Sequence, residues 1–338
     1  MTIKDLSAQT GYSVGTISRV LNNQPNVSQK ARDTILRAAA ECGFQLNANA
    51  KQLKQQHGNS ILVVVKGTSN ELFSSLVEAL QARIASTSYP LIVDYMDEAE
   101  NEVRRALQLC LEKKPRGVLF LGGNRENFLA DFDNIHMPCV LVTNDASSLP
   151  FPNLSSVSLD NTVAAKMAVE HLISMGHQKI AVIGGPRIYS DTTKQRFQGC
   201  VEAFQEHGID FDDVQDYESV RFSFAGGYQG VTRLLERGRE FTGIFAMSDV
   251  MAIGAIRALR DAGKRVPEDV SVVGFDGLTI GEYTVPKLTT ITQPVEELAD
   301  RSVRLLQKMI EGRITAAHET VSVALEARES ARPATRTE

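Results

Sequence analysis

The 338-residue sequence contains no run of about 18 apolar residues, the length that a helix needs to cross a bilayer. Its N-terminus, MTIKDLSAQT, lacks the charged segment and apolar core of a secretory signal. The few cysteines are scattered, with no CxxC pair and no metal-ligand spacing: Cys42, Cys110, Cys139 and Cys200. We therefore expect a cytoplasmic, reduced protein with no membrane segment and no metal site.

Phosphate-binding loops are also missing from the sequence. The glycine pairs Gly184-Gly185 and Gly226-Gly227 stand outside the GxGxxG and GxxxxGK[ST] contexts that cradle phosphates. His171 and His177 are separated by a spacing that suits metal binding on a helix poorly. The sequence therefore predicts no catalytic residue and no cofactor, and a sugar-active α/β enzyme is kept only as an alternative.

A helix–turn–helix pattern occupies the N-terminal region and is clearest from Gly11 onward. Gly11 can adopt positive φ at the turn, and Ser13 can cap the helix that follows. The apolar residues of that helix recur every three or four positions and form one face: Val14, Ile17, Val20 and Leu21. Its other face is small or hydrogen-bonding, as entry into a major groove requires: Gly15, Thr16, Ser18, Arg19 and Asn22.

Two further helices are predicted around this segment. In the first, inward-facing positions are Ile3, Leu6 and Ala8. Ser28 can cap the third, whose inward-facing positions are Ala31, Ile35, Ala38 and Ala39. On the polar helix alone, an ordinary face in a small helical bundle would be an equally good interpretation.

Charge is distributed unevenly along the chain. Residues 1–57 contain seven Lys and Arg against three acidic residues, which gives +4. The whole chain carries −5, so residues 58–338 carry −9. A basic head on an acidic body favours phosphate contact by the head alone.

From residue 60 onward, short apolar runs alternate with amphipathic helical stretches. The predicted strands are Ile61–Val65, Leu91–Val93, Val118–Leu121, Cys139–Val142, Val157–Leu159, Ile180–Ile183, Ile244–Met247 and Val270–Phe275. The predicted helices lie near 71–86, 99–113, 161–175, 192–207, 224–237 and 249–262. Strands that are apolar throughout and joined by helices indicate a doubly wound parallel sheet. Two such sheets are expected, because one alone would need an unusually large number of strands.

The N-terminal segment resembles the DNA-binding headpiece and hinge of the LacI/GalR family of bacterial repressors. The similarity lies in T-x-S-R-V-L-N at Thr16–Asn22 and N-x-x-A-x-x-L at Asn47–Leu53. It implies that Arg19 and Thr16 read bases, that Ser18 touches phosphate and that Gly15 contributes shape only. The DNA-binding residues that it implies are Thr2, Ser13, Val14, Gly15, Thr16, Ser18, Arg19, Asn22, Asn26, Ser28, Ala50, Lys51 and Leu53.

The resemblance continues through Val169–Ala181, Ser248–Ala255, Val266–Asp276 and Pro286–Ile291. It implies an all-α helix–turn–helix headpiece followed by a periplasmic-binding-protein-like α/β core of two doubly wound parallel-sheet subdomains. Three chain crossings would join these subdomains, near 157–160, 288–292 and 318–322. The implied domains are a headpiece at 1–45, a hinge helix and linker at 46–58, an effector-binding and dimerisation domain at 59–330 (N-subdomain about 60–157 and 290–320, C-subdomain about 160–288), and a flexible tail at 331–338.

Polar residues that directly follow the apolar runs are candidates for a ligand site, because ligands bind at the carboxyl ends of parallel strands. Carboxylates and amides in this position suit the paired hydroxyls of a sugar-like ligand. Arg196 could make a bidentate contact, and Phe73 and Phe222 could stack on an apolar ring face. The predicted effector-binding residues are Asn70, Phe73, Thr143, Asp160, Arg196, Phe222, Ser248 and Asp276.

Structural alternatives exist for several of these positions. Asp249 follows a strand but fits a helix N-cap better, and Arg196 could belong to a surface ion pair. The resemblance aligns Asp276 and Arg196 with the effector-binding Asp and Arg of the family, and Ser248 with a ligand-contacting Asn or Ser. Thr143 stands where many sugar-binding members have Asp, so no particular sugar is implied.

The resulting hypothesis is a homodimeric transcriptional repressor that binds a near-palindromic double-stranded DNA operator and responds to a small sugar-like effector. Dimerisation is expected because helix–turn–helix half-sites impose two-fold geometry. A solute-binding receptor of the same two-lobed fold is the alternative, but it would require an export signal and no DNA-binding head.

The hinge generates the first prediction. The resemblance implies that Leu53 enters the minor groove from a short hinge helix, whereas the alternative is a plain linker. Leu53→Ala should therefore weaken operator binding by roughly tens-fold, because the kinked duplex loses its wedge. Operator and effector titrations on one preparation measure both effects. Unchanged operator affinity would rule out the hinge assignment, and effector affinity serves as the internal control.

Overall fold

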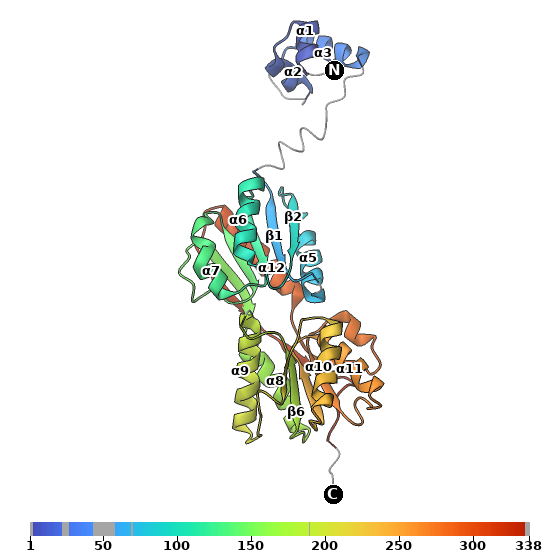
Figure 1. The fold of residues 1–338 in the computed structure, drawn as a ribbon. Helices are drawn as coiled ribbons and strands as arrows, with labels where there is room; N and C mark the ends of the chain where they lie inside the picture. The colour runs from blue at the N-terminus through green and yellow to red at the C-terminus, as the bar shows by residue number, and fades with distance from the viewer. Residues whose placement is uncertain (1–2, 22–26, 43–57, 69, 189, 335–338) are drawn as a thin grey trace. The chain divides into compact units, whose positions relative to one another are not determined.

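The computed structural model describes residues 3–21, 27–42, 58–68, 70–188 and 190–334, and Figure 1 shows its fold. The chain divides into two compact units, Met1–His57 and Gly58–Glu338. Several predicted DNA contacts lie outside the described residues, together with the hinge: Thr2, Asn22, Asn26, Ala50, Lys51 and Leu53.

The first unit is a bundle of α1 (Ile3–Thr10), α2 (Val14–Leu21) and α3 (Gln29–Glu41). Its core contains Leu6, Ile17, Val20, Ile35, Ala38 and Ala39. The Ser13 hydroxyl accepts a hydrogen bond from the Thr16 amide at 3.2 Å, and the Ser28 hydroxyl accepts one from the Ala31 amide at 3.3 Å. Gly11 has φ 73°. The described part of this unit therefore has the predicted turn and both predicted caps.

One inward-facing position in the first unit is wrong. Ala8 is exposed rather than packed inward. It lies two positions after Leu6 on α1, and residues two apart on a helix do not share a face. Leu6 alone of the two therefore reaches the core, where it is fully buried.

The second unit contains two six-stranded sheets with helices on both faces (Figure 1). The first sheet is wholly parallel, in the order β11-β5-β4-β3-β1-β2. Its strands are β1 (Ile61–Lys66), β2 (Leu91–Met96), β3 (Gly117–Leu121), β4 (Cys139–Thr143), β5 (Leu154–Leu159) and β11 (His318–Val321). Its helices are α5 (Glu71–Ile84), α6 (Glu102–Lys113), α7 (Arg125–Asp131), η1 (Phe132–Asn134) and α12 (Val295–Ile310). Helices α5 and α12 pack together, as do α6 and α7.

The second sheet has the order β12-β10-β9-β8-β6-β7, and only β12 runs antiparallel to its neighbour. Its strands are β6 (Ile180–Gly184), β7 (Tyr217–Ser219), β8 (Gly243–Ala246), β9 (Ser271–Asp276), β10 (Thr289–Thr292) and β12 (Ala324–Glu326). Its helices are α8 (Asn161–Ser174), α9 (Asp191–Glu206), α10 (Phe224–Glu236), α11 (Asp249–Asp261) and η2 (Thr279–Glu282). Helix α8 packs on α9, and α10 packs on α11.

The predicted fold class is confirmed, and every predicted apolar run is a strand of one of the two sheets. The sequence patterns missed β7, β10, β11, β12, the short helix α7 and the long amphipathic helix α12. These strands were missed because they are short or rich in hydroxyl and charged side chains, as in Thr-Thr-Ile-Thr of β10. They therefore lack the apolar run that marks a strand buried on both faces.

The chain crosses between the subdomains three times, and the positions differ in part from those expected. The first crossing lies between β5 and α8, within the predicted range. Residues 290–292 were assigned to the N-subdomain, but they pair with β9 in the second sheet, so the second crossing follows Thr292. The third crossing lies between β11 and β12, after which the chain returns to the second sheet.

The expected flexible tail is wrong for residues 331–334. The Ala334 amide donates to the Met175 carbonyl at 2.8 Å, and the Arg332 amide donates to Ser271 Oγ at 3.1 Å. Just before them, Ser330 Oγ donates to the Val272 carbonyl at 2.6 Å. Residues 330–334 are therefore fastened to the second subdomain by hydrogen bonds, which the polar composition of this segment did not reveal.

Candidate functional site

A cleft of about 330 Å³ lies at the carboxyl ends of the parallel strands of both sheets. Strands that run in parallel present these ends on one edge, where the loops that follow them meet. The N-subdomain contributes Lys66, Gly67, Thr68, Asn70, Leu72, Phe73, Asp97, Glu98, Ala99, Gly122, Gly123, Thr143 and Asn144. The C-subdomain and the crossing contribute Pro186, Ser190, Thr192, Arg196, Arg221, Phe222, Ser223, Asp276 and Gln293. Both walls therefore carry polar groups and one phenylalanine each.

Arg196 projects from α9 and is almost completely buried. Its Nε donates to Asn161 Oδ1 at 2.9 Å, and its guanidinium also donates to the Met247 carbonyl at 2.5 Å. The guanidinium carbon lies 3.6 Å from the centroid of the Phe275 ring. Burial lowers the pKa of Arg196 to about 10, so the side chain is protonated at neutral pH. The predicted alternative of a surface ion pair does not apply to Arg196.

Asp276 ends β9 with φ 124°, a conformation that side chains other than glycine rarely adopt. Its backbone carbonyl accepts from the Gln293 amide at 3.0 Å, and its Oδ1 accepts from Gln293 Nε2 at 2.7 Å. Burial raises the pKa of the Asp276 carboxyl above its ordinary value, and the nearby Arg196 guanidinium opposes that rise. Gln293 therefore holds both the strained backbone and the carboxylate of Asp276.

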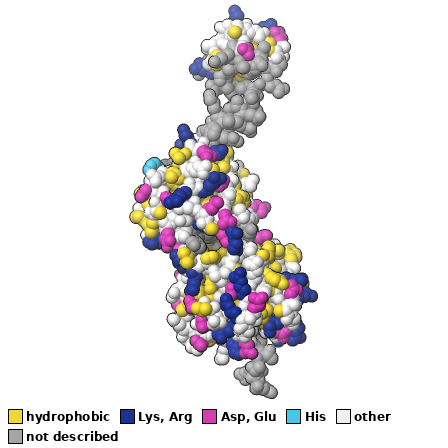
Figure 2. Space-filling model, viewed as in Figure 1, with side chains coloured by type: hydrophobic (Ala, Val, Ile, Leu, Met, Phe, Trp, Pro, Cys, Tyr) yellow, Lys and Arg dark blue, Asp and Glu magenta, His cyan; other side chains and the backbone are white. Residues whose placement is uncertain are grey.

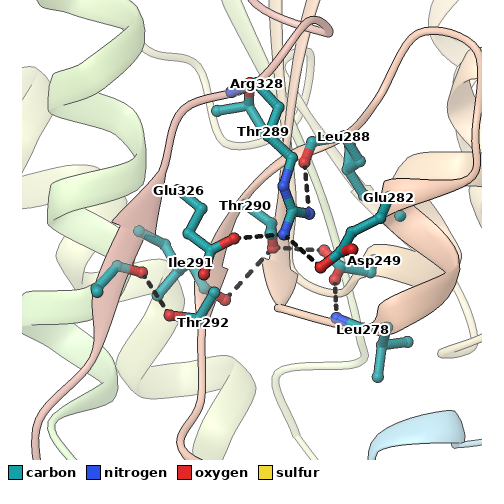
Figure 3. Close-up of polar contacts among 12 residues, drawn as sticks. Asp249, Leu278, Glu282, Leu288, Thr289, Thr290, Ile291, Thr292, Glu326 and Arg328 are labelled. Atoms are coloured by element: carbon teal, nitrogen blue, oxygen red, sulfur yellow. Dashed lines mark hydrogen bonds and ion pairs between the residues drawn. The ribbon is translucent and has the colours of Figure 1, made fainter.

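A second carboxyl group, that of Asp249, is buried in the same subdomain (Figure 3). Its oxygens accept from the Leu278 amide and from Thr290 Oγ1, each at 2.6 Å. Burial and the neighbouring Asp276 carboxylate both raise the pKa of Asp249. The interpretation of Asp249 as a helix N-cap is wrong, because Ser248 caps α11 and accepts from the Met251 amide at 3.3 Å.

The opposite wall is formed by the end of β4. Thr143 has φ 77° and its hydroxyl donates to Asn144 Oδ1 at 3.2 Å. Asn144 Nδ2 donates to the Gly123 carbonyl at 3.2 Å and, across the cleft, to Thr192 Oγ1 at 3.1 Å. Asn144 therefore connects the two subdomains with a single amide group.

The two aromatic rings pack against glycines at strand ends. A Cβ added to Gly122 would lie 3.0 Å from Phe73 Cζ, and one added to Gly185 would lie 2.4 Å from Phe222 Cε2. The absence of a side chain at both glycines lets each ring approach the backbone where a strand meets the cleft. Phe73 and Phe222 thus give apolar surface to both walls, as their predicted stacking role requires.

Six of the eight predicted effector-binding residues line the cleft: Asn70, Phe73, Thr143, Arg196, Phe222 and Asp276. Asn70 also caps α5, where its Oδ1 accepts from the Leu72 amide at 3.1 Å. Asp160 and Ser248 do not line it, and each is the N-cap of the helix that follows its strand. Asp160 is exposed, and its Oδ1 accepts from the Val163 amide at 2.9 Å.

The sequence patterns missed an ion-pair bridge at the mouth of the cleft. Arg221, which follows β7, donates to Asp97 Oδ2 at 2.6 Å and to Glu98 Oε1 at 2.8 Å, and both acids follow β2. The Ala99 amide and Arg221 lower the pKa of Asp97, so this carboxylate is ionised at neutral pH. In the sequence, Asp97 and Glu98 follow an apolar run, and this position could have marked them as cleft residues. No sequence pattern marked Arg221.

The opposite side of the cleft is also bridged. The Arg125 amide donates to Asp191 Oδ2 at 2.5 Å, and Lys194 Nζ lies 3.7 Å from Glu126 Oε1. Residues 125 and 126 begin α7 of the N-subdomain, whereas residues 191 and 194 begin α9 of the C-subdomain. The subdomains are thus held close at both ends of the cleft.

In the first unit, α2 presents Val14, Gly15 and Arg19 to solvent. Val14 was expected in the apolar face, but it lies at the exposed edge of that face, where it remains a candidate DNA contact. The Thr16 hydroxyl shares a 2.9 Å hydrogen bond with the Ser13 hydroxyl. The Ser18 side chain lies outside the described residues.

Comparison with known proteins places this architecture in a family. Residues 2–47 match the family described as bacterial regulatory proteins, lacI family, and residues 169–331 match the periplasmic binding protein-like domain. The chain is 35% identical over 313 residues to the HTH-type transcriptional regulator MalR of Clostridium butyricum, with 92% of this chain and 93% of that protein covered. This chain belongs to the lacI family of bacterial regulatory proteins.

Other members of the lacI family show the same full-length likeness. The HTH-type transcriptional repressor CytR of Escherichia coli is 30% identical over 311 residues, which cover 92% of this chain and 90% of CytR. A crystal structure of the Lac repressor dimer bound to operator and the anti-inducer ONPF superposes with a TM-score of 0.78 at 26% identity, covering 98% and 99% of the two chains. The regulator CelR in complex with cellobiose gives a TM-score of 0.70 at 27% identity, with the same coverage.

Within the described ranges, no helix is both long and apolar enough to cross a membrane. The same residues contain no group of three or more His, Cys, Asp or Glu side chains arranged to hold a metal ion.

The bridge at the cleft mouth generates the second prediction. Arg221→Ala removes both ion pairs between β2 and β7, so peptides covering residues 97–99 and 219–223 should exchange amide hydrogens several-fold faster. Hydrogen–deuterium exchange on the full chain measures this. Arg257→Ala, which breaks a pair with Asp261 inside α11, is the matched control and should leave these peptides unchanged. Equal exchange in the Arg221 variant and the wild type would show that the bridge does not hold the mouth closed.

Proposed function

We propose that this chain is a homodimeric transcriptional repressor whose affinity for a near-palindromic DNA operator is controlled by a sugar-like effector in the cleft. The proposal is supported above all by one combination. The same chain carries a basic helix–turn–helix unit and a closed cleft with Arg196, Asp276 and Gln293 at the strand ends. A solute-binding receptor would not need the helix–turn–helix unit, and an enzyme would need reactive groups in the cleft.

For the DNA contacts, we propose that the exposed face of α2 enters the major groove. Arg19 is exposed on that face and can form a bidentate contact with guanine. Gly15 lets the helix backbone approach the groove. Thr16 contacts a base if its hydroxyl leaves its hydrogen bond with Ser13 and bonds to the base instead. The remaining proposed contacts to phosphate and to the minor groove are Thr2, Ser13, Val14, Ser18, Asn22, Asn26, Ser28, Ala50, Lys51 and Leu53.

For the effector, the cleft offers donors and acceptors side by side. Arg196 donates, Asp276 accepts, and Asn144 does both, which suits hydroxyl groups that also do both. The apolar rings of Phe73 and Phe222 suit the C–H faces of a pyranose or furanose. Structural relatives named as complexes with cellobiose and with ribose support this class of ligand.

For the dimer, we propose that the segment around η2 contacts a second copy. Ile280, Tyr283 and Val285 are 40%, 80% and 83% exposed. This segment is anchored by Arg328, which follows β12. The Arg328 guanidinium donates to Glu282 at 3.3 Å and to the Leu288 carbonyl at 3.1 Å (Figure 3). Apolar side chains exposed on a well-anchored segment indicate a protein interface. Figure 2 shows hydrophobic side chains gathered on one flank of the second subdomain, amid otherwise mixed charges.

For coupling, we propose that the effector acts on the angle between the subdomains. It would touch both walls and compete with or add to the cross-cleft contacts of Asn144 and Arg221. A ligand shifts such an equilibrium only by its differential affinity for the two arrangements. We also propose that the protein works in the cytoplasm without a catalytic step, since its relatives are transcriptional regulators and its DNA partner is there.

A gel-shift experiment tests the repressor function. The full chain should bind its own promoter in a salt-sensitive manner, because Lys and Arg displace counterions from phosphates. Arg19→Ala should relax the sequence preference at the base pair that it reads, with a loss of about 1–3 kcal/mol expected for one base-reading Arg. Arg37→Ala, an exposed position on α3 of the same charge, is the matched control and should retain the preference. Binding that persists without residues 1–57 would refute the proposal.

Sedimentation velocity tests the dimer surface. Tyr283→Asp places a charge in the proposed interface, so the variant should sediment as a monomer at concentrations where the wild type is a dimer. Val214→Asp, at a position that is 68% exposed elsewhere in the second subdomain, should stay dimeric. A dimeric Tyr283 variant would exclude this segment from the interface.

A further inference from the structure

Among the described residues that line the cleft, the cationic side chains are those of Lys66, Arg196 and Arg221. Their surroundings decide what charge a ligand can carry there. An anionic ligand needs a cation whose charge is not already balanced, because an unbalanced buried charge is costly. Each of the three cations therefore has to be examined for an acidic neighbour.

Lys66 ends β1 and forms an ion pair with Glu102, whose side chain is fully buried. The Glu102 carboxylate also accepts from the Asn124 amide at 2.6 Å and from Asn127 Nδ2 at 2.8 Å. These hydrogen bonds fix the carboxylate beneath the cleft floor. The charge of Lys66 is thus balanced from inside the protein before any ligand arrives.

The positive charge of Arg221 is more than balanced by its acidic neighbours. Two carboxylates, those of Asp97 and Glu98, accept from its single guanidinium. The mouth of the cleft therefore carries one net negative charge, and an approaching anion meets repulsion there first.

Arg196 is almost completely buried, and the nearby Asp276 carboxylate favours its charged form. Arg196 has five N–H donors, and Asn161 and the Met247 carbonyl engage two of its nitrogens. Donors therefore remain for a ligand, but their positive charge is opposed by Asp276. Asp249 adds another carboxyl group near Asp276.

Gln293 makes a separate demand on the ligand. It is 5% exposed, and its Oε1 is buried with no hydrogen-bond partner among the described residues. The amide orientation follows from chemistry, because the Nε2 end must be the one that donates to the Asp276 carboxylate. An unpartnered buried oxygen is satisfied only by a donor. A hydroxyl supplies one, so this oxygen favours a hydroxylated ligand, whereas the charge of the ligand is decided by the ion pairs described above.

We infer that the effector is an uncharged polyhydroxylated molecule, such as a free sugar or glycoside, and neither a phosphate ester nor a sugar acid. The three cations of the cleft face four carboxyl groups, those of Glu102, Asp97, Glu98 and Asp276, and the buried Gln293 oxygen requires a donor. A phosphate ester would bring about −1.5 to −2 charges at neutral pH into this surrounding. The inference rests on the proposed function, because it concerns the occupant of the same cleft.

Matched ligand pairs test this inference on the full-length protein. Thermal shift and calorimetry would compare D-ribose with D-ribose 5-phosphate, and D-glucose with D-glucose 6-phosphate and D-gluconate, with cellobiose and maltose added. We expect at least one neutral compound to bind, and its charged counterpart to bind at least about tenfold more weakly, a difference of about 1.4 kcal/mol. A phosphate ester or acid that binds more tightly than its neutral parent would overturn the inference while leaving a sugar-responsive repressor intact.

Variants separate the charge argument from simple fit. Asp97→Asn combined with Glu98→Gln frees Arg221, so discrimination against the phosphate ester should shrink several-fold while the neutral sugar still binds. Asp261→Asn, on α11 and paired with Arg257, is the control and should keep the full ratio. An unchanged ratio in the double variant would overturn the charge argument. If no compound of either charge shifts the melting temperature, the sugar effector of the proposed function fails, and this inference fails with it.

Discussion

The direction of the strands is the constraint on which this structure depends. Because neighbours run parallel from β2 to β11 in one sheet and from β7 to β10 in the other, each sheet gathers its strand ends along one edge. Residues far apart in the sequence, such as Phe73 and Asp276, line the same cleft for this reason. The cleft is therefore a product of topology first, and the particular side chains decide only what it holds.

Buried charge is the second organising feature. The cleft contains groups that would be costly to bury singly, and each cation is matched by an acid or an aromatic face: Arg196 by Asp276 and Phe275, Lys66 by Glu102. Such matched groups contribute little net stability, but loss of one partner leaves the other as an uncompensated buried charge. The same arrangement that holds the walls in place therefore selects among ligands by their charge.

Much of the fold could be predicted because apolar runs mark central parallel strands unambiguously. The site was harder, for a physical reason. In a doubly wound fold, the residue that follows a strand often also begins a helix, so a polar residue there can line the cleft, cap the helix or, like Asn70, do both. Asp276 does the first, and Asp160 and Ser248 do the second. Nothing local marked Lys66 and Glu102 as partners, since 36 positions separate them and each looks like a surface charge.

Thr143 and Asp276 have a consequence for how such a protein changes over time. Both hold left-handed or otherwise rare backbone angles at the cleft, φ 77° and 124°, where glycine or asparagine would be more comfortable. Selection for thermal robustness alone would tend to replace them, and with them the shape of the walls. Both residues line the cleft, so the rare backbone angles stand where the walls face the cleft and not in the packed core. Laboratory evolution toward a heat-tolerant biosensor would have to protect these two positions deliberately.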